Sequence, residues 1–485
     1  MGKVGIVARP LSWKPGVISL FGAKRRSTFG GYGKSSRKGS GLSVGNMIPM
    51  FEPLTPAIGV VRNTKLSNPN LNRVSEADAT IHNWYRFVLS FPPHLVRDYL
   101  ADRFATRGGL TRGQTILDPF CGTGTTIVEA RRLGYEAVGI EAHPMAHFAS
   151  RVKANWIGNP GEIERLAALT AGTAERTRAA TRKPRTLDAE QKKLLLKDCI
   201  CEGPLNKVLI LNATIEKVFP PDLIDYARLA LAKVAVSTAS NLHFGPEVGV
   251  RGCKLDADVF GAWQLQMKII AGDLRMVQMQ AGPFVDAMVY RADARAMNGI
   301  LPPRSVNAVF TSPPYPNEKD YTRTTRLESV ILGFLTDKKS LRAIKQPLMR
   351  SNTRNIYKGD EDHLYAERFT DVGKLAAEIE RKRIEAGADS GFERLYHRVT
   401  TLYFGGMARH FDELRTALAP GASLGYVVGD QASFFRVHIP TAEILAKIAR
   451  HYGYEHVETE VFRTRIATAT KKQMEEHVLW LRWPG

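Results

Sequence analysis

A run of small and polar residues in the sequence has the chemistry of a ligand-binding turn. The run is DPFCGTGTT at residues 118–126. Gly122 and Gly124 lack Cβ atoms, so a ligand can rest on the backbone, and the expected following helix points free N–H groups toward it. The run has two of the three glycines of a dinucleotide motif and no lysine after the turn. A ligand that carries a ribose but needs no phosphate therefore fits best.

Two acids are expected to complete this ligand site. Glu141 follows a predicted strand at 135–140, where an acid can accept hydrogen bonds from ribose hydroxyls. Asp293 follows a predicted strand at 287–290 and so lies at the same ligand-facing edge, where its carboxylate can accept an adenine amino group. A surface glutamate or a turn-forming aspartate would explain each acid taken alone. The combination with the glycine turn favours ligand binding.

A second segment, TSPPY at residues 311–315, has the chemistry needed to hold an amino group. Pro313 and Pro314 lack N–H groups and fix the backbone, so the carbonyls before them form rigid acceptors. The Ser312 hydroxyl and the Pro313 carbonyl could draw a conjugated amine toward tetrahedral geometry and restore its nucleophilic lone pair. Tyr315 offers a flat face on which a base turned out of a duplex can stack. A plain turn is the alternative, but the position directly after a buried strand favours the functional interpretation.

Alternating strands and helices are expected to bring the two segments together. The pattern predicts a helix near 92–100, another near 441–452, and seven strands, at 115–118, 135–140, 287–290, 306–310, 423–428, 456–463 and 477–483. Such alternation predicts an α/β fold with a mostly parallel sheet and helices on both faces. The ends of these strands would then place the turn and the proline pair at one edge.

The chain divides into four predicted parts. Residues 1–80 form a basic flexible arm, 81–158 the first part of the catalytic domain, 159–283 an inserted helical subdomain, and 284–485 the second part of the catalytic domain. The start of the arm, to about residue 46, is rich in Gly, Ser, Lys and Arg and buries too little apolar surface to order itself. It could clasp phosphates, act as a transit-like peptide, or derive from a wrong choice of start codon. The insert is a possible reader of the target.

Charge and composition favour a nucleic-acid partner without identifying the chemistry. The formal net charge of +20 suits a polyanion, although a merely basic protein would show the same value. The four cysteines have no zinc-finger spacing, so neither a metal site nor a disulfide framework is expected. No apolar run approaches the roughly 20 residues that span a bilayer, so no membrane association is expected. These observations predict a cytoplasmic setting of the bacterial or archaeal type, with nucleoid association.

The two motifs together resemble those of the DNA amino-methyltransferases. The segment DPFCGTGTT with Glu141 resembles their S-adenosylmethionine motif, and TSPPY is similar to their catalytic motif in its N4-cytosine form. The stretches FPPHLVRDYL, GYVVGD and IPT resemble flanking elements of the same family. The resemblance covers about residues 81–157 and 287–483. It implies a Rossmann-like methyltransferase fold with a seven-stranded sheet. In many members SPPY precedes the cofactor motif, whereas here it follows.

The resemblance also implies roles for individual residues. Those expected to bind S-adenosyl-L-methionine are Asp118, Phe120, Gly122, Gly124, Thr125, Glu141 and Asp293. Those expected to hold the base are Ser312, Pro313, Pro314 and Tyr315. The sequence further suggests contacts to nucleic acid from Lys319, Tyr321, Arg323, Arg350, Arg354 and Lys358, with a solvated basic face as the alternative.

The implied function is site-specific methylation of cytosine N4 in double-stranded DNA, with the base flipped out of the helix. Three alternatives remain open: adenine N6 methylation of DNA, guanine-N2-type methylation of tRNA or other RNA, and an inactive nucleic-acid-binding protein with the same fold. A cognate restriction endonuclease, as in restriction-modification, is a possible partner.

Overall fold

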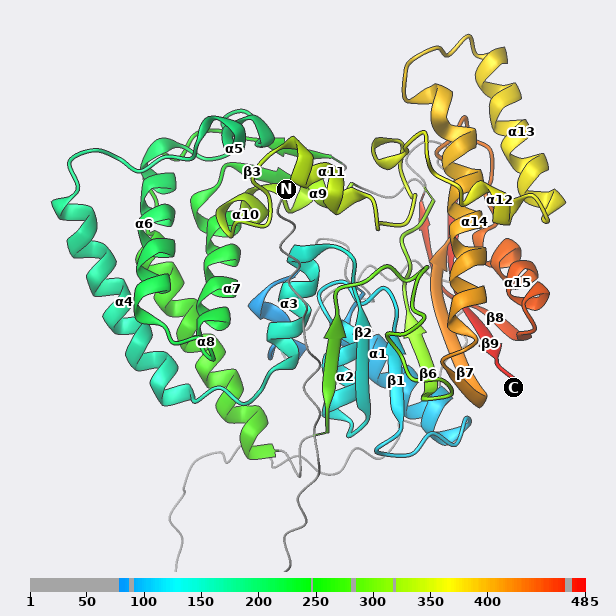
Figure 1. The fold of residues 1–485 in the computed structure, drawn as a ribbon, viewed down its shortest axis with the longest axis horizontal. Helices are drawn as coiled ribbons and strands as arrows, with labels where there is room; N and C mark the ends of the chain where they lie inside the picture. The colour runs from blue at the N-terminus through cyan, green and yellow to red at the C-terminus, as the bar shows by residue number, and fades with distance from the viewer. Residues whose placement is uncertain (1–77, 87–90, 246, 281–284, 317–319, 467–472) are drawn as a thin grey trace, which may run out of the picture. The chain divides into compact units, whose positions relative to one another are not determined.

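The structure is a computed structural model that describes residues 78–86, 91–245, 247–280, 285–316, 320–466 and 473–485. These residues belong to one compact unit (Figure 1). Nearly all of the basic arm predicted at 1–80 lies outside the described residues.

A seven-stranded sheet forms the centre of this unit and confirms the predicted fold class. Its strands lie in the order β5-β2-β1-β6-β7-β9-β8. All neighbouring pairs from β5 to β7 are parallel, whereas β9 runs antiparallel to both β7 and β8. The bounds are β1 Thr115–Asp118, β2 Glu136–Ile140, β5 Ala287–Tyr290, β6 Val306–Thr311, β7 Leu418–Gly429, β8 Glu455–Ile466 and β9 Gln473–Arg482. The fold is therefore Rossmann-like and mostly parallel.

Apolar residues cover both faces of the sheet, as a mostly parallel sheet requires. Along β6, Ala308 and Phe310 face one core and Val309 faces the other, because successive side chains of a strand point to opposite faces. The first core also contains side chains from α1, from the π-helix η4 and from α2. The second contains side chains from α13, α14 and α15.

Helices pack around the sheet on both sides (Figure 1). Those of the catalytic part are η3 His82–Trp84, α1 Pro93–Tyr99, η4 Leu100–Thr106, α2 Thr125–Arg132, α3 Pro144–Ala154, α9 Tyr321–Thr324, α10 Arg326–Ile331, α11 Lys338–Lys345, η6 Thr353–Asn355, α12 His363–Ala366, α13 Thr370–Glu385, η7 Glu393–Leu395, α14 Tyr396–Leu414 and α15 Thr441–His451. Helix α1 begins with a proline at its first position, where the missing N–H costs no helical hydrogen bond.

The segment between α3 and β5 is mostly helical. It contains α4 Pro160–Ala180, α5 Ala189–Leu194, α6 Glu202–Val218, α7 Ile224–Val234, the π-helix η5 Ala235–Ala239, the hairpin strands β3 Leu242–Phe244 and β4 Val248–Val250, and α8 Val259–Gln280. Its buried side chains share one core with Ile81, Trp84 and the α3 residues Met145 and Phe148. This helical segment therefore packs directly against the part of the chain that carries the glycine turn.

One pair of cysteines is joined, although the sequence predicted no disulfide framework. Cys201 and Cys253 are joined, with their Cα atoms 6.4 Å apart. They are 52 positions apart in the sequence, and the chain brings them together because Asn241 pairs with both Cys199 and Arg251 through its backbone. Sequence spacing could not reveal this contact.

Within the described parts of the chain, no helix is both long enough and apolar enough to cross a membrane.

Candidate active site

One cavity brings the two motifs of the sequence together. It has a volume of about 750 Å³, and its walls come from the residues that follow β1, β2, β5, β6 and β7. Both Gly122 and Pro313 line it, although nearly two hundred positions separate them in the chain. The carboxyl ends of neighbouring parallel strands meet at one sheet edge, so this is where a ligand-binding crevice is expected.

The glycine turn is held in a conformation that needs its glycines. Gly122 and Gly124 have φ values of 52° and 83°, in the left-handed region that disfavours other residues. No atom lies within 4 Å of the Cβ position of Gly122, whereas a Cβ on Gly124 would lie 2.9 Å from Ser150 Cβ. The buried Lys153 donates to the Thr123 carbonyl at 2.8 Å, and burial lowers the pKa of Lys153 to about 7. Gly122 thus leaves room for a ligand, and Gly124 lets the turn pack against α3.

Asp118 ties the glycine turn to the strand before the proline pair. Its Oδ1 atom accepts a hydrogen bond from Thr311 Oγ1 at 2.6 Å and another from the Phe120 N–H at 3.1 Å. Burial raises the pKa of the Asp118 carboxyl to about 6. Asp118 does not line the cavity, so its place in the structure is beneath the site, where it fixes the ends of β1 and β6 relative to each other.

Glu141 lies at the end of β2 and lines the cavity. Its Oε2 atom accepts a hydrogen bond from the Gly122 N–H at 2.9 Å, and Oε1 accepts one from the His143 N–H at 2.7 Å. Enclosure by the protein raises the pKa of Glu141 to about 7, against the lowering effect of these two donors. Each carboxylate oxygen keeps a further lone pair for a ligand hydroxyl.

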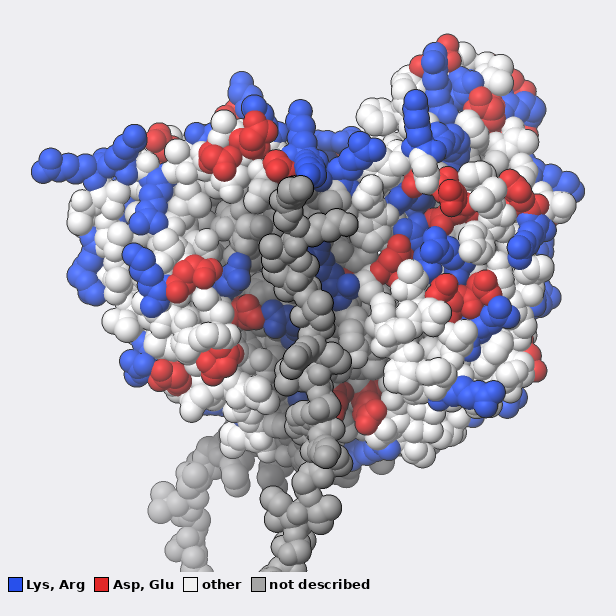
Figure 2. Space-filling model, in the orientation of Figure 1, with Lys and Arg blue, Asp and Glu red and all other residues white. Residues whose placement is uncertain are grey.

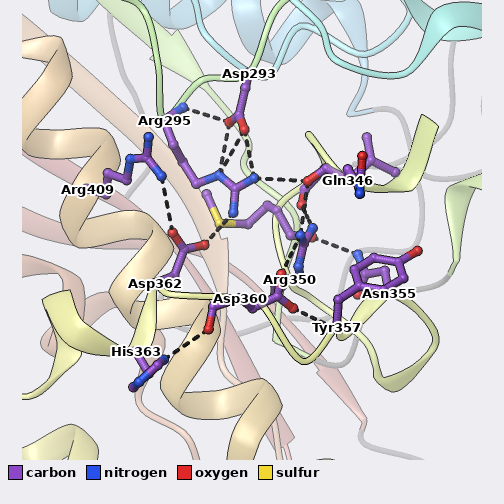
Figure 3. Close-up of polar contacts among 12 residues, drawn as sticks. Asp293, Arg295, Gln346, Arg350, Asn355, Tyr357, Asp360, Asp362, His363 and Arg409 are labelled. Carbon is purple, nitrogen blue, oxygen red and sulfur yellow. Dashed lines mark hydrogen bonds and ion pairs between the residues drawn. The ribbon is translucent and has the colours of Figure 1, made fainter. Parts of the chain in front are cut away.

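Asp293 lines the same cavity and belongs to a cluster of charged residues (Figure 3). The buried guanidinium of Arg295 donates to Asp293 Oδ2 at 2.7 Å through one terminal nitrogen and to Asp362 through the other. The side chain of Asp293 is still 22% exposed. Arg295 therefore orients the carboxylate and leaves it accessible from the cavity.

The four residues predicted to hold the base, Ser312 to Tyr315, all line the same cavity. Ser312 Oγ donates its hydrogen to the carbonyl of Val427 on the neighbouring strand β7, at 3.0 Å. The ring of Tyr315 lies against Gly429, where a Cβ atom would be 2.8 Å from the ring. The serine oxygen can consequently act toward the cavity only as an acceptor.

Comparison with known proteins agrees with this geometry. A family profile described as DNA methylase matches residues 68–150. The chain is also 26% identical over 465 residues to the type II methyltransferase M.BsoBI of Geobacillus stearothermophilus, covering 86% of this chain and 87% of that protein. The chain is related to the DNA methyltransferases. The resemblance found in the sequence is confirmed.

Two solved structures were also found to be similar to this chain. One is an S-adenosylmethionine-dependent methyltransferase of Methanosarcina mazei, with a TM-score of 0.28, 9% identity and coverage of 78% of this chain and 96% of that one. The other is the rRNA methyltransferase aviRa of Streptomyces viridochromogenes, with a TM-score of 0.29, 9% identity and coverage of 87% and 95%.

DNA methyltransferases take their methyl group from S-adenosylmethionine, and the cavity fits this cofactor. The open space over Gly122 accommodates a ligand on the backbone, and Glu141 presents acceptors for ribose hydroxyls. Phe120, Thr125 and Asp293 also line the cavity. Its apolar wall beside Asp293 can take a flat ring; this wall includes Ile140, Ala292, Ala294, Pro347, Leu348 and Met349. The described residues contain no cluster of side chains suited to a metal ion.

The residues predicted to contact nucleic acid are not all placed for it. Tyr321 and the exposed Arg354 line the cavity. Lys358 is also exposed and follows Arg354 closely in the sequence. Arg323 is half-buried and does not line the cavity, and Lys319 lies outside the described residues.

Arg350 contradicts the prediction of a phosphate contact. Its side chain is only 5% exposed and bonds to Asp360 and to the backbone carbonyls of Lys345, Gln346 and Leu348 (Figure 3). Arg350 therefore anchors the loop between α11 and η6, which lines the cavity, instead of facing solvent.

Several cavity residues were not recognised in the sequence. Arg463 of β8 and Glu476 of β9 form an ion pair in the cavity wall, and Gln431 follows the end of β7. Arg463 and Glu476 belong to the antiparallel hairpin of β8 and β9. They lie at the cavity because this hairpin pairs with β7, which the local sequence does not indicate. For Gln431 a signal existed, since it directly follows the GYVVGD stretch at 425–430.

Proposed function

We propose that this chain transfers a methyl group from S-adenosylmethionine to the N4 amine of a cytosine in double-stranded DNA, with the cytosine turned out of the helix. The observation that carries the proposal is the hydrogen bond from Ser312 Oγ to the Val427 carbonyl. Because the serine hydrogen is already engaged, the oxygen presents lone pairs beside the Pro313 carbonyl. Two acceptors side by side match the two hydrogens of an exocyclic amine.

These acceptors also supply the chemistry. The lone pair of an exocyclic amine is delocalised into the ring, so the amine is a weak nucleophile. Hydrogen bonds to Ser312 Oγ and the Pro313 carbonyl pull the nitrogen toward tetrahedral geometry and localise the lone pair. The Tyr315 ring, held against Gly429, supports the base from one side. S-adenosylmethionine bound here would supply an electrophilic methyl group: the N4–CH3 bond would form as the S–CH3 bond breaks, the neutral thioether would leave, and the surplus N4 proton would pass to solvent. Positioning of the amine by these residues lowers the barrier to the transfer.

The charge of the chain and its rim residues support a DNA partner. Lys and Arg side chains stand along the upper edge of the face in Figure 2, over the region of α5, α11 and α13, with acids between them. Arg354 at the cavity rim lies 5.5 Å over the Phe392 ring and is exposed. Arg354 and Lys358 are our candidates for contacts to phosphates that flank the flipped nucleotide.

The helical segment at 159–283 is our candidate for reading the target sequence. It packs against α3, directly behind the glycine turn, and so adjoins the catalytic part. The similarity to M.BsoBI, a type II methyltransferase by name, supports a place in restriction-modification beside a cognate endonuclease.

The purified full chain, incubated with unmethylated DNA and labelled S-adenosylmethionine, tests the proposal. Digestion to nucleosides and mass analysis should give N4-methylcytosine. A product of N6-methyladenine would overturn the choice of base. In a parallel incubation that also contains RNA, methyl label found in the RNA and not in the DNA would overturn the choice of nucleic acid.

A Ser312→Ala variant tests the catalytic assignment. It should lower the rate of transfer by about tenfold or more while leaving S-adenosylmethionine affinity unchanged, because one of the two acceptors is lost. Ser305→Ala is the matched control, since Ser305 lies just before β6, at the strand end away from the cavity. Among the described residues, its hydroxyl bonds to the Pro302 carbonyl alone. An undiminished rate in Ser312→Ala would remove Ser312 from the mechanism.

A further inference from the structure

We propose that Gln431 reads the ring nitrogen next to the amine that is methylated, and so helps to select the target base; this inference rests on the proposed function. Gln431 is 8% exposed and lines the cavity. Its side-chain amide has no hydrogen-bond partner among the described residues. Buried amides are normally hydrogen-bonded, so an unpaired one in a cavity wall points to a ligand.

The backbone of Gln431 is fixed on both sides. Its N–H donates to the Ile439 carbonyl at 3.3 Å, and its own carbonyl accepts from the Ile439 N–H at 2.7 Å. The preceding Asp430 accepts hydrogen bonds from the Thr441 N–H at 3.1 Å and from His438 at 2.9 Å. The side chain therefore leaves a rigid support, which suits a residue that discriminates between ligands.

Gln431 belongs to the base half of the cavity because it lies just beyond the end of β7. Ser312 bonds to Val427 of this strand, and the Tyr315 ring lies against Gly429. Gln431 comes two residues after Gly429, beyond the same strand end. Strand β7 thus supports both Gln431 and the residues proposed to hold the amine, Ser312 and Tyr315.

The chemistry of cytosine supplies the partner. Ser312 Oγ and the Pro313 carbonyl use both hydrogens of the N4 amine, which leaves the adjacent N3 atom as an acceptor without a donor. The amide nitrogen of Gln431 can donate to N3. Without this donor the buried N3 would be unsatisfied, at a cost that raises the barrier to transfer.

Asn352 is a weaker candidate for the same role. It is 9% exposed and also lines the cavity. Its Oδ1 atom accepts from the Arg354 N–H at 3.0 Å, as the cap of η6. It lies on the loop that Arg350 anchors, and Gln346 of that loop accepts a hydrogen bond from Arg295, the partner of Asp293. Part of the Asn352 amide is therefore already engaged within the protein, which makes it the weaker candidate.

The test combines a change in the protein with a change in the base. The DNA is a duplex carrying the site that methylation sequencing maps in an expressing host, with either cytosine or 3-deazacytosine at the target position. Gln431→Glu keeps the shape of the side chain and removes its donor; Gln431→Leu removes both polar atoms. The measured quantities are kcat/KM for transfer and the Kd of S-adenosylmethionine.

Wild-type protein should lose about tenfold or more in kcat/KM when N3 is replaced by carbon, which is the scale of one unsatisfied buried group. Both Gln431 variants should show a similar loss with cytosine and little further loss with 3-deazacytosine, because the contact can be lost only once. Cofactor Kd should not change. Gln114→Leu, at a half-buried glutamine just before β1 that does not line the cavity, should behave as wild type.

Losses that multiply in the combined experiment would overturn the inference, because Gln431 would then act on something other than N3. An unchanged kcat/KM in both variants would do the same. If wild-type protein methylates no DNA at all, the proposed function itself fails, which is a different outcome. If the product is N6-methyladenine, 1-deazaadenine takes the place of 3-deazacytosine, since adenine N1 is the acceptor beside that amine.

Discussion

Glu141 shows how one residue serves both the protein and a ligand. Its carboxylate holds the Gly122 and His143 N–H groups and so shapes the turn before any ligand binds. The sequence predicted a ligand-binding role for this acid because the glycine turn and the following strand form a recognisable unit. It could not predict the raised pKa, which depends on how completely neighbouring elements enclose the side chain.

Cofactor affinity should depend on pH through Glu141. Its pKa of about 7 means that the group is largely protonated at pH 6 and largely ionised at pH 8. Only the ionised form keeps all its lone pairs as acceptors, so S-adenosylmethionine should bind up to about tenfold more tightly at pH 8 than at pH 6. Equilibrium binding across this range measures the effect.

Glu141→Gln is the control, because it removes the titration and should give weaker, pH-independent binding. If the variant keeps the wild-type pH profile, the effect belongs to another group, of which Asp118, with a pKa of about 6, is the nearest candidate.

At the scale of elements, the strands were predictable where short apolar runs end at turn residues. Strands β1 and β5 have the predicted bounds, 115–118 and 287–290. Strand β7 begins five residues earlier than predicted, because Pro420 and Gly421 normally mark a turn and here lie within the strand. The cavity wall from β8 and β9 was not predictable, since the antiparallel hairpin joins the sheet beside β7 through long-range pairing.

Gly124→Ala should destabilise the turn between β1 and α2. The new Cβ would lie 2.9 Å from Ser150 Cβ, and the φ of 83° is unfavourable for alanine by about 1–2 kcal/mol before the clash is counted. We expect a lower melting temperature and weaker cofactor binding, measured by thermal denaturation with and without S-adenosylmethionine.

Gly272→Ala in α8 is the matched glycine substitution. Gly272 is exposed, and its Cβ position has no atom within 4 Å. Alanine is the better helix former, so stability should rise by up to about 1 kcal/mol. Equal melting temperatures for the two variants would contradict our account of the turn.

At the scale of the molecule, the helical segment and the catalytic part share one hydrophobic core. Trp263 of α8 is fully buried in the cluster that also contains Phe148 of α3. The sequence showed a change of character at about residue 159 but not this packing, because contacts between distant helices leave no local pattern. We therefore expect the described unit to unfold as one.

Trp263→Ala should lower the stability of the whole unit by about 3–5 kcal/mol, the usual cost of emptying a buried aromatic site. Calorimetry should show one transition, shifted to lower temperature, with cofactor binding lost in the same range. Leu265→Ala, two residues along the same helix and 61% exposed, should change little. Two separate transitions would show that the helical segment unfolds independently.

The hydrogen bond from Ser312 to Val427 also determines which bases the site excludes. Thymine, and the uracil that forms when cytosine is deaminated, carry a keto oxygen where cytosine carries its amine. That oxygen would face two other oxygens with no proton between them, and the repulsion would expel the base. Discrimination between amino and keto bases therefore needs no additional bulky side chain, because the engaged Ser312 hydroxyl and the Pro313 carbonyl provide it together.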